Sequence, residues 1–218
     1  MKKIDVNFKK PSQEQSSTLL VYYQTGRYID AEKLSISITK EFPKHPFAWK
    51  VLGAILKQTN RISESLVATQ KSVQLDPLDS EAHKNLAIIF EEIGRLNEAE
   101  TSLRQAIALK PDFAEAHSNL GNTLKILGRL DEAETSLRQA IALKPDYAEA
   151  HNNLGNTLKI LGRLDEAETN YRKVIALKPD FAGVYSNLGV ILKELERLDE
   201  AETNYRQAIE LKPDYAEA

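Results

Sequence analysis

The 218-residue chain contains no cysteine, and this absence excludes several kinds of site at once. Without a thiol the chain can form neither a disulfide bond nor a thiolate metal centre, and it has no cysteine nucleophile. An excess of charge of one sign is also missing. The 29 basic and 32 acidic residues give a net charge of −3, and the two signs are interspersed. This charge pattern argues against binding to nucleic acid or to a membrane surface.

Long apolar runs are missing as well. Residues 1–8 have the basic start of a secretory signal, but no apolar stretch of about seven or more residues follows them. No window approaches the roughly 20 apolar residues that a membrane span requires. These absences predict a cytoplasmic protein.

A period of 34 residues runs through the chain, and near the middle the copies are almost identical. Residues 114–147 read AEAHSNLGNTLKILGRLDEAETSLRQAIALKPDY, and residues 148–181 read AEAHNNLGNTLKILGRLDEAETNYRKVIALKPDF. A fixed period of this length indicates a stack of repeats, each of which is too small to bury its own apolar face. A tail at 1–11 precedes the repeats, and residues 216–218 begin a truncated seventh. The six complete repeats are predicted at 12–45, 46–79, 80–113, 114–147, 148–181 and 182–215.

Within one repeat, the apolar residues predict two antiparallel helices. In the repeat at 114–147, apolar residues recur at helical spacing as far as Gly128, and a second run from Leu130 ends at Pro145. A helix start is indicated wherever Ser or Asp is followed three residues later by Gln or Glu, because such pairs form capping boxes. The predicted pairs are Ser12–Gln15, Asp112–Glu115 and Asp131–Glu134.

The fixed places of the repeat carry a family resemblance. An aromatic residue or His stands fourth, Leu-Gly seventh and eighth, a large apolar residue eleventh, Gly fifteenth, Ala twentieth and twenty-seventh, and Pro thirty-second. In the second repeat these places include Trp49, Leu52, Gly53, Leu56 and Pro77. The pattern resembles that of the tetratricopeptide repeat (TPR) family. The resemblance implies an all-α fold, a right-handed TPR superhelix (α-solenoid) of six helix-turn-helix repeats, whose first helices line a concave groove.

Three histidines, His83, His117 and His151, lie 34 residues apart, but the spacing does not suit a metal site. Equivalent places in neighbouring repeats lie roughly 8–10 Å apart, whereas two ligands of one zinc ion each lie about 2.0–2.1 Å from it. We interpret these histidines as packing residues. Neither a nucleophile with a nearby base nor a phosphate-binding glycine loop is found. The chain is therefore predicted to have no catalytic residues, no metal and no cofactor, and not to be an enzyme.

Asparagine recurs at the sixth place of four successive repeats and at the ninth place of two. Residues three apart lie on the same face of a helix, and an amide can bond both the C=O and the N–H of a peptide unit. The alternative is that these amides bond only within or between neighbouring first helices, or were copied along with a recent duplication of the repeat. The predicted groove residues are Asn85, Asn119, Asn122, Asn153, Asn156 and Asn187, with Glu115, Lys125, Glu149 and Lys159 along the groove edges.

The repeated Asn-Leu-Gly-Asn is similar to the TPR region of O-GlcNAc transferases, in which an asparagine ladder lines the superhelix. The leader, from Pro11 to Lys50, is similar to bacterial TPR proteins whose array precedes a transferase domain. These resemblances imply a parent protein longer than this chain, with any catalysis outside it.

Three functions are consistent with these observations. The first is a protein-interaction scaffold that binds an extended polypeptide segment in its concave groove. The second is the substrate-recognition arm of a larger transferase. The third is a structural module that self-assembles through its end faces, because Tyr205, Ile209 and Leu211 lack a following repeat to cover them. The predicted partner is a protein or peptide, or another copy of the chain, with neither nucleic acid nor membrane.

Overall fold

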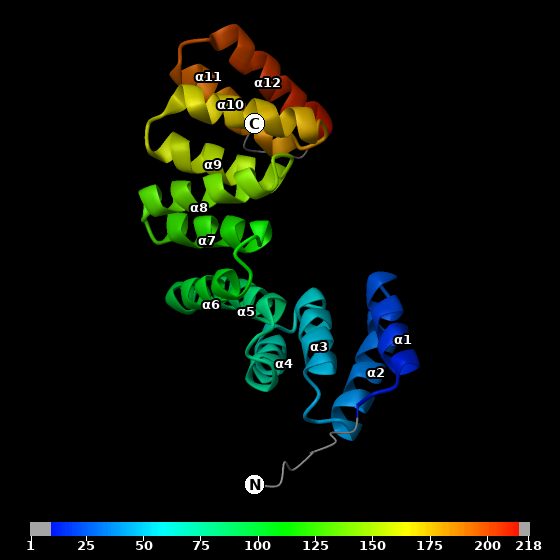
Figure 1. Ribbon diagram of the computed structural model, residues 1–218. Coiled ribbons are helices and arrows are strands. Elements are labelled where there is room, and N and C mark those ends of the chain that lie inside the picture. The colour runs from blue at the N-terminus through cyan, green and yellow to red at the C-terminus, as the bar shows by residue number, and fades with distance from the viewer. Residues whose placement is uncertain (1–9, 214–218) are drawn as a thin grey trace. The chain divides into compact units, whose positions relative to one another are not determined.

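The computed structural model describes residues 10–213, and within them every regular element is an α-helix (Figure 1). The predicted all-α solenoid of helix-turn-helix repeats is confirmed. The expectations for residues 1–9 and 216–218 lie outside the described part of the chain. The twelve helices are α1 (Gln13–Gln24), α2 (Tyr28–Glu41), α3 (Pro46–Gln58), α4 (Ile62–Leu75), α5 (Ser80–Glu92), α6 (Leu96–Leu109), α7 (Ala114–Ile126), α8 (Leu130–Leu143), α9 (Ala148–Ile160), α10 (Leu164–Leu177), α11 (Ala182–Glu194) and α12 (Leu198–Leu211).

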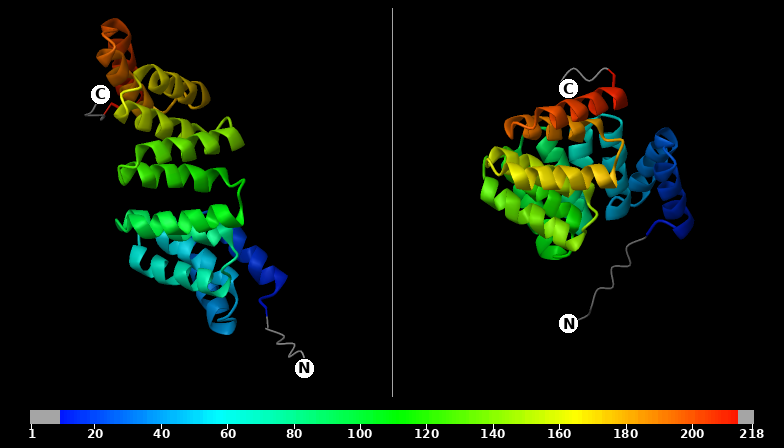
Figure 2. Two further views of the ribbon diagram at one scale, coloured as in Figure 1. Left: turned by 60° about the vertical axis from the view of Figure 1, so that its left-hand side comes forward. Right: turned by 90° about the horizontal axis from the view of Figure 1, so that it is seen from above.

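The chain forms two compact units, Met1–Pro111 and Asp112–Ala218. Inside each unit every helix packs against the next one along the chain, and the first helices of successive pairs also touch, as α7 and α9 do. Figure 2 shows α7 to α10 as successive antiparallel layers. Each unit is therefore a stack of helix pairs with its own apolar core.

The turn inside each helix pair requires a left-handed backbone. Gly128, between α7 and α8, has φ of 76°, and Gly162 has φ of 73° at the same place one repeat later. Glycine adopts this conformation without a steric penalty, since it has no Cβ. Asn60 and Glu196 occupy the place with φ of 60°, so two of these turns bear a side chain that strains them.

The capping boxes follow the prediction only at the first helix. The Ser12 side chain accepts from the Gln15 N–H at 3.0 Å, and the Gln15 side chain accepts from the Ser12 N–H at 2.8 Å. The boxes predicted for α7 and α8 are wrong. The N-cap residues there are Phe113 and Arg129, and neither side chain caps its helix.

The reason is that neither aspartate stands at the N-cap, because Asp112 lies one place before Phe113 and Asp131 lies two places after Arg129. Asp131 stands inside the first turn of α8. Glu134 faces arginines instead and pairs with Arg138 at 2.8 Å and with Arg163 at 2.6 Å. Glu134 thus joins α8 to the next repeat through its ion pair with Arg163.

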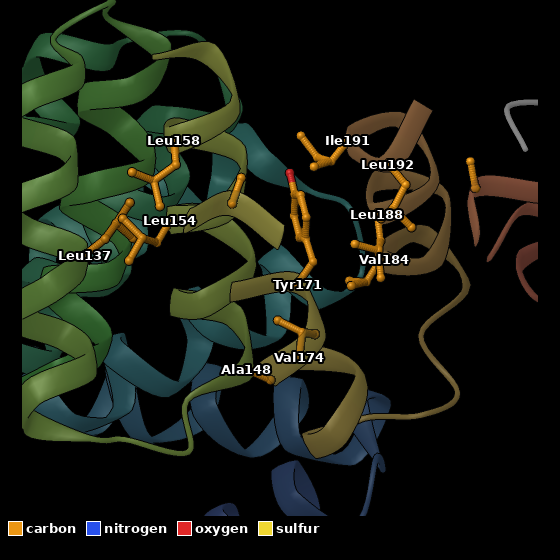
Figure 3. Close-up of a cluster of buried hydrophobic side chains, with 12 residues drawn as sticks. Leu137, Ala148, Leu154, Leu158, Tyr171, Val174, Val184, Leu188, Ile191 and Leu192 are labelled. Atoms are coloured by element: carbon orange, nitrogen blue, oxygen red, sulfur yellow. The ribbon is translucent and has the colours of Figure 1, made fainter. Parts of the chain in front are cut away.

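The two helices of a pair approach closely where glycine stands eighth in the repeat. A Cβ placed on Gly155 would lie 2.7 Å from Cε1 of Tyr171, which is closer than carbon atoms pack. Figure 3 shows the Tyr171 ring standing between Leu154 and Leu158 on one side and Leu188 and Ile191 on the other. Tyr171 is fully buried, so the core of the second unit is built around this ring.

Candidate functional site

The first helices of the second unit carry a stripe of partly exposed side chains. On α7 the stripe consists of Glu115, Asn119, Asn122 and Ile126, at spacings of four, three and four residues. Such spacings place side chains on one face of a helix. The equivalent residues are Glu149, Asn153, Asn156 and Ile160 on α9, and Asn187, Val190 and Glu194 on α11. We call these residues the first-helix stripe.

The sixth-place amides of α7 and α9 are free to bind another molecule. The side chains of Asn119 and Asn153 are half-buried, and within residues 10–213 neither makes a hydrogen bond. An amide that has no internal partner keeps its donors and its acceptor available. These two side chains therefore show no bond to a neighbouring helix within the described residues, and their role in binding stays a prediction.

The ninth-place amide of α9 is already engaged. Oδ1 of Asn156 accepts a hydrogen bond of 2.8 Å from the hydroxyl of Tyr171 and a longer one of 3.4 Å from Nδ2 of Asn187. The sixth-place amide of Asn187 is thus engaged too, through a bond between neighbouring first helices, whereas Asn119 and Asn153 make no such bond within the described residues.

Asn85 lies on α5, in the first unit, with a half-buried side chain that makes no hydrogen bond among the described residues. The stripe described above belongs wholly to the second unit. Whether all four sixth-place amides form one line stays a prediction.

A cavity of about 370 Å³ opens beside Asn153, between the start of α9 and the loop that leads into α11. Phe181 forms one wall and is 41% exposed. Oδ1 of Asn152 is buried and accepts no hydrogen bond within the described residues. A rotation that turned this oxygen toward the cavity would therefore break no existing bond to it. The cavity is lined by Glu149, Asn152, Asn153, Lys178, Asp180 and Phe181.

Of these lining residues, sequence reasoning missed Asn152, Lys178, Asp180 and Phe181. A signal was present, because an aromatic residue ends the repeat as Phe113, Tyr147 or Phe181. The sequence alone did not indicate a binding function for this aromatic place.

Tyr147 stands at the same place one repeat before Phe181. Its hydroxyl donates to Oε2 of Glu149 at 3.1 Å. Burial raises the pKa of Tyr147, and the carboxylates of Glu149 and Glu115 raise it further. The hydroxyl therefore stays protonated and holds the Glu149 carboxylate near the start of the first-helix stripe.

Of the predicted edge residues, Glu115 and Glu149 belong to the stripe itself, and Lys125 and Lys159 lie next to it. Lys125 and Lys159 are half-buried, each three residues after a ninth-place asparagine. The apolar side chains of Ile126 and Ile160 are 51% and 58% exposed on the same face. A bound segment therefore meets apolar surface as well as amides and charges.

Family models for tetratricopeptide repeats match the chain from residue 89 onward. The one described as TPR repeat matches residues 89–128, 121–162 and 155–196, and the one described as Tetratricopeptide repeat matches residues 182–215. Together they cover more than half of the 218 residues. The chain belongs to the tetratricopeptide repeat family.

Solved TPR proteins share this fold. The crystal structure of MamA is 28% identical and covers 77% of this chain and 98% of its own, with a TM-score of 0.67. YrrB, described as a TPR protein with an unusual peptide-binding site, is 22% identical, with coverages of 84% and 94% and a TM-score of 0.65. PilW, described as a widely conserved type IV pilus biogenesis factor, is 20% identical, with coverages of 95% and 97% and a TM-score of 0.86. No curated protein sequence matches the chain, so the resemblance to O-GlcNAc transferases stays a prediction.

The fourth-place residues of the TPR repeats serve packing, whatever their type. Trp49, His151 and Tyr185 each place a polar atom 3.0–3.1 Å from the backbone oxygen of the proline that ends the preceding repeat. Nδ1 of His151 also lies 2.9 Å from Oδ1 of Asn170. Among the described residues no group of three or more His, Cys, Asp or Glu side chains could hold a metal ion.

The last helix of the TPR array exposes apolar side chains. Ile209 is 44% and Leu211 is 37% exposed, and Tyr205 is half-buried, whereas Tyr171 at the same place one repeat earlier is fully buried. A search of the described helices for an apolar stretch long enough to cross a bilayer finds no candidate.

Proposed function

We propose that the second unit binds an extended polypeptide segment along the first-helix stripe. The observation that carries this proposal is the state of Asn119 and Asn153, two half-buried amides at equivalent places with no internal hydrogen bond. The TPR fold supports a protein-interaction scaffold in general, and TPR scaffolds are generally non-catalytic. YrrB, which has the same fold, is described as binding a peptide.

The repeat spacing suits an extended chain. Neighbouring first helices are about 9 Å apart, and three residues of extended chain span about 10 Å. One repeat therefore advances by the same length as three peptide residues. Each amide can bond the C=O and N–H of the peptide unit that it faces, because it has both donors and an acceptor.

The apolar part of the stripe selects side chains of the bound segment. Ile126 and Ile160 are equivalent residues on α7 and α9, and both are more than half exposed. The cavity beside Phe181 has room for one apolar or aromatic side chain. We therefore expect a segment with apolar residues at every third place.

A peptide selection tests this function. Peptides are selected from a displayed random library against the whole chain, and their affinities are measured by calorimetry. Replacing Asn119→Ala and Asn153→Ala together should weaken binding about tenfold or more, since each lost hydrogen bond contributes about 1 kcal/mol. N-methylation of the peptide at every third residue should have a similar effect, because it blocks the backbone donors.

The matched control replaces two exposed amides on second helices, Gln105→Ala and Gln139→Ala, and should leave the affinity unchanged. Equal affinities for the two double variants would contradict the proposal. Selection of helical peptides, insensitive to N-methylation, would contradict it as well.

Self-association is a second candidate function, favoured by the exposed apolar residues of α12. A strip containing Tyr205, Ile209 and Leu211 can bury apolar area against another copy of the chain. Light scattering from micromolar to millimolar protein should show the mass rising, and Ile209→Lys should reduce the rise. Ile93→Lys, at an isoleucine that is 40% exposed in the first unit, is the control. A constant mass across this range would remove this candidate.

As a recognition arm of a transferase, the TPR array would use the same stripe to hold a substrate segment. The amide variants described above would then lower the turnover of the linked enzyme for protein substrates. Turnover of a small-molecule substrate that does not reach the array would be unchanged.

A further inference from the structure

A groove in the first unit differs at three places from the corresponding surface of the second unit. It runs between α2 and α4 over α3, and its cavity has a volume of about 610 Å³. Ile36 of α2, Trp49 of α3 and Val67 of α4 all line it. The residues at the same places three repeats later are Arg138, His151 and Thr169. Three polar residues of the repeat have thus been replaced by apolar ones around a single space, which we call the α2–α4 groove.

In the second unit, ion pairs close the corresponding gap. Arg138 of α8 binds Glu134 at 2.8 Å and Glu166 of α10 at 2.9 Å. Arg163 binds the same two carboxylates, each at 2.6 Å. The four side chains form a ring of ion pairs that joins the two second helices.

In the first unit, two of the four ion pairs of this ring are missing. Arg61 binds Glu32 and Glu64, each at 2.5 Å, as Arg163 binds its two carboxylates. Ile36 stands at the place of Arg138 and supplies no charge. The gap stays open, and Val67 is 65% exposed beside it.

The groove is long and straight. On α2 its wall includes Glu32, Ile36 and Lys40, which are one helical turn apart, and α4 contributes a similar stripe. A second cavity of about 440 Å³ shares Trp49 and Val67 with the first and extends toward the end of α4. The groove therefore extends along much of both helices, with its apolar side chains in the middle and polar or charged ones toward its ends.

The charges at the two ends of the groove differ. At the end near Arg61, both carboxylates are paired. At the other end, Lys40 makes no ion pair within the described residues, and Lys71 donates only to Oε1 of Gln74 at 3.0 Å. Two positive charges at this end therefore lack a carboxylate.

We infer that the α2–α4 groove binds an amphipathic helix of another protein, with the apolar face of that helix on Trp49 and Val67 and an acidic residue at the end that meets Lys40 and Lys71. A helix bonds its own backbone and needs only apolar contact from the walls. An extended segment would leave its backbone groups unpaired here, because the floor and the middle of both walls are apolar. The surface lies outside the first-helix stripe and is independent of the function proposed there.

Trp49 is the only tryptophan of the chain, so its emission reports directly on the groove. The probe is a synthetic, tryptophan-free helix of about 14 residues, about 21 Å long, with leucines at i, i+4, i+7 and i+11. It is made with two glutamates at its N-terminal end, with two at its C-terminal end, or with lysines in their place. One of the glutamate peptides should shift Trp49 emission to the blue, with saturation. The lysine peptides should bind about tenfold more weakly, because they repel Lys40 and Lys71.

Ile36→Arg is the deciding variant. The new guanidinium can reach Glu64 and close the gap, so the urea midpoint should not fall and the affinity for the peptide should drop about tenfold or more. Ser37→Arg adds the same charge one residue on, at an exposed place outside the groove, and should leave the affinity unchanged.

Three results would overturn the inference. In the first, none of the glutamate peptides moves Trp49 emission at up to millimolar concentration. In the second, binding survives Ile36→Arg unchanged while the fold is intact. In the third, the emission shifts with protein concentration alone and the mass rises with it, which would make a second copy of the chain the occupant.

Discussion

The hydroxyl of Tyr171 donates a hydrogen bond of 2.8 Å to Oδ1 of Asn156, joining α10 to the exposed face of α9. The ring itself is fully buried, while the amide that it holds is only half-buried. One repeat earlier, Leu137 occupies the place of Tyr171 and has no hydroxyl to donate. In this repeat the core residue Tyr171 thus holds the ninth-place amide of Asn156 from within.

Replacing Tyr171→Phe should lower the free energy of unfolding of the second unit by about 1 kcal/mol, the usual net value of one hydrogen bond. The variant keeps the packed ring and removes only the hydroxyl. Urea denaturation followed by circular dichroism measures the change. Tyr205→Phe is the matched control, because Tyr205 is half-buried and its hydroxyl makes no hydrogen bond within the described residues. Equal losses for the two variants would show that the bond to Asn156 contributes nothing.

Gly155→Ala should destabilise the second unit by about 1–3 kcal/mol, as overpacking of a core does. The added Cβ would lie 2.7 Å from Cε1 of Tyr171, and that ring is enclosed on both sides. Gly189→Ala creates a similar clash, with Cε1 of Tyr205 at 2.6 Å. It should cost less, since the half-exposed Tyr205 ring can move outward. A larger loss for Gly189→Ala in urea denaturation would refute this account.

The Lys50–Asp79 pair should make the stability of the first unit depend on pH. The two side chains are 2.6 Å apart, and Asp79 also accepts from the Ala82 N–H at the start of α5. Burial alone would raise the pKa of Asp79, but the bonds from Lys50 and Ala82 lower it below its ordinary value of 3.8. A carboxyl group whose pKa is lower in the folded state than in the unfolded state stabilises the fold in full at any pH above its unfolded-state pKa. This stabilisation is lost as the pH falls through the folded-state pKa.

Asp79→Asn keeps the helix cap and removes the charge, so it should cost about 1 kcal/mol at neutral pH after allowance for screening by solvent. The difference from the wild type should shrink as the pH falls below about 4. Lys50→Met should give a similar loss at neutral pH, and the double variant should add little to it. A difference that stays constant down to the lowest pH would rule out the ion pair as its source.

The repeat period predicted the helices well, because each helix is specified by its own apolar spacing and by the turn that follows. The caps of α7 and α8 were predicted wrongly because the partners of an acidic residue can lie beyond its own stretch of sequence. Glu134 has Asp131 three residues before it, but its structural partners are Arg138 and Arg163, and Arg163 belongs to the next repeat. A local spacing cannot distinguish a capping acid from one that pairs across helices.

The sequence predicted which helices carry the candidate residues, but not which of their side chains are engaged. The sequence placed Asn119 and Asn156 on one kind of surface, but only the packing of Tyr171 shows that Asn156 is engaged. The division of the chain after Pro111 was not predictable either. The sequence Lys-Pro-Asp occurs at this boundary and recurs one repeat later, inside the second unit.

The turn between α11 and α12 offers a stabilising substitution. Glu196 adopts φ of 60° at a place where glycine stands in four other repeats, at φ between 73° and 76°. A residue with a Cβ pays roughly 1–2 kcal/mol to adopt this conformation, and within the described residues the Glu196 side chain makes no hydrogen bond or ion pair. Glu196→Gly should therefore raise the urea midpoint, although the greater freedom of glycine in the unfolded chain offsets part of the gain. We expect a net gain of about 0.5–1 kcal/mol.

The reciprocal change Gly162→Ala puts a Cβ into open space at φ of 73°, so its cost isolates the backbone strain from any steric clash. It should lower the stability by about 1 kcal/mol. If Glu196→Gly lowered the midpoint instead, the left-handed turn would owe its stability to the glutamate side chain, and the argument from backbone strain would fail.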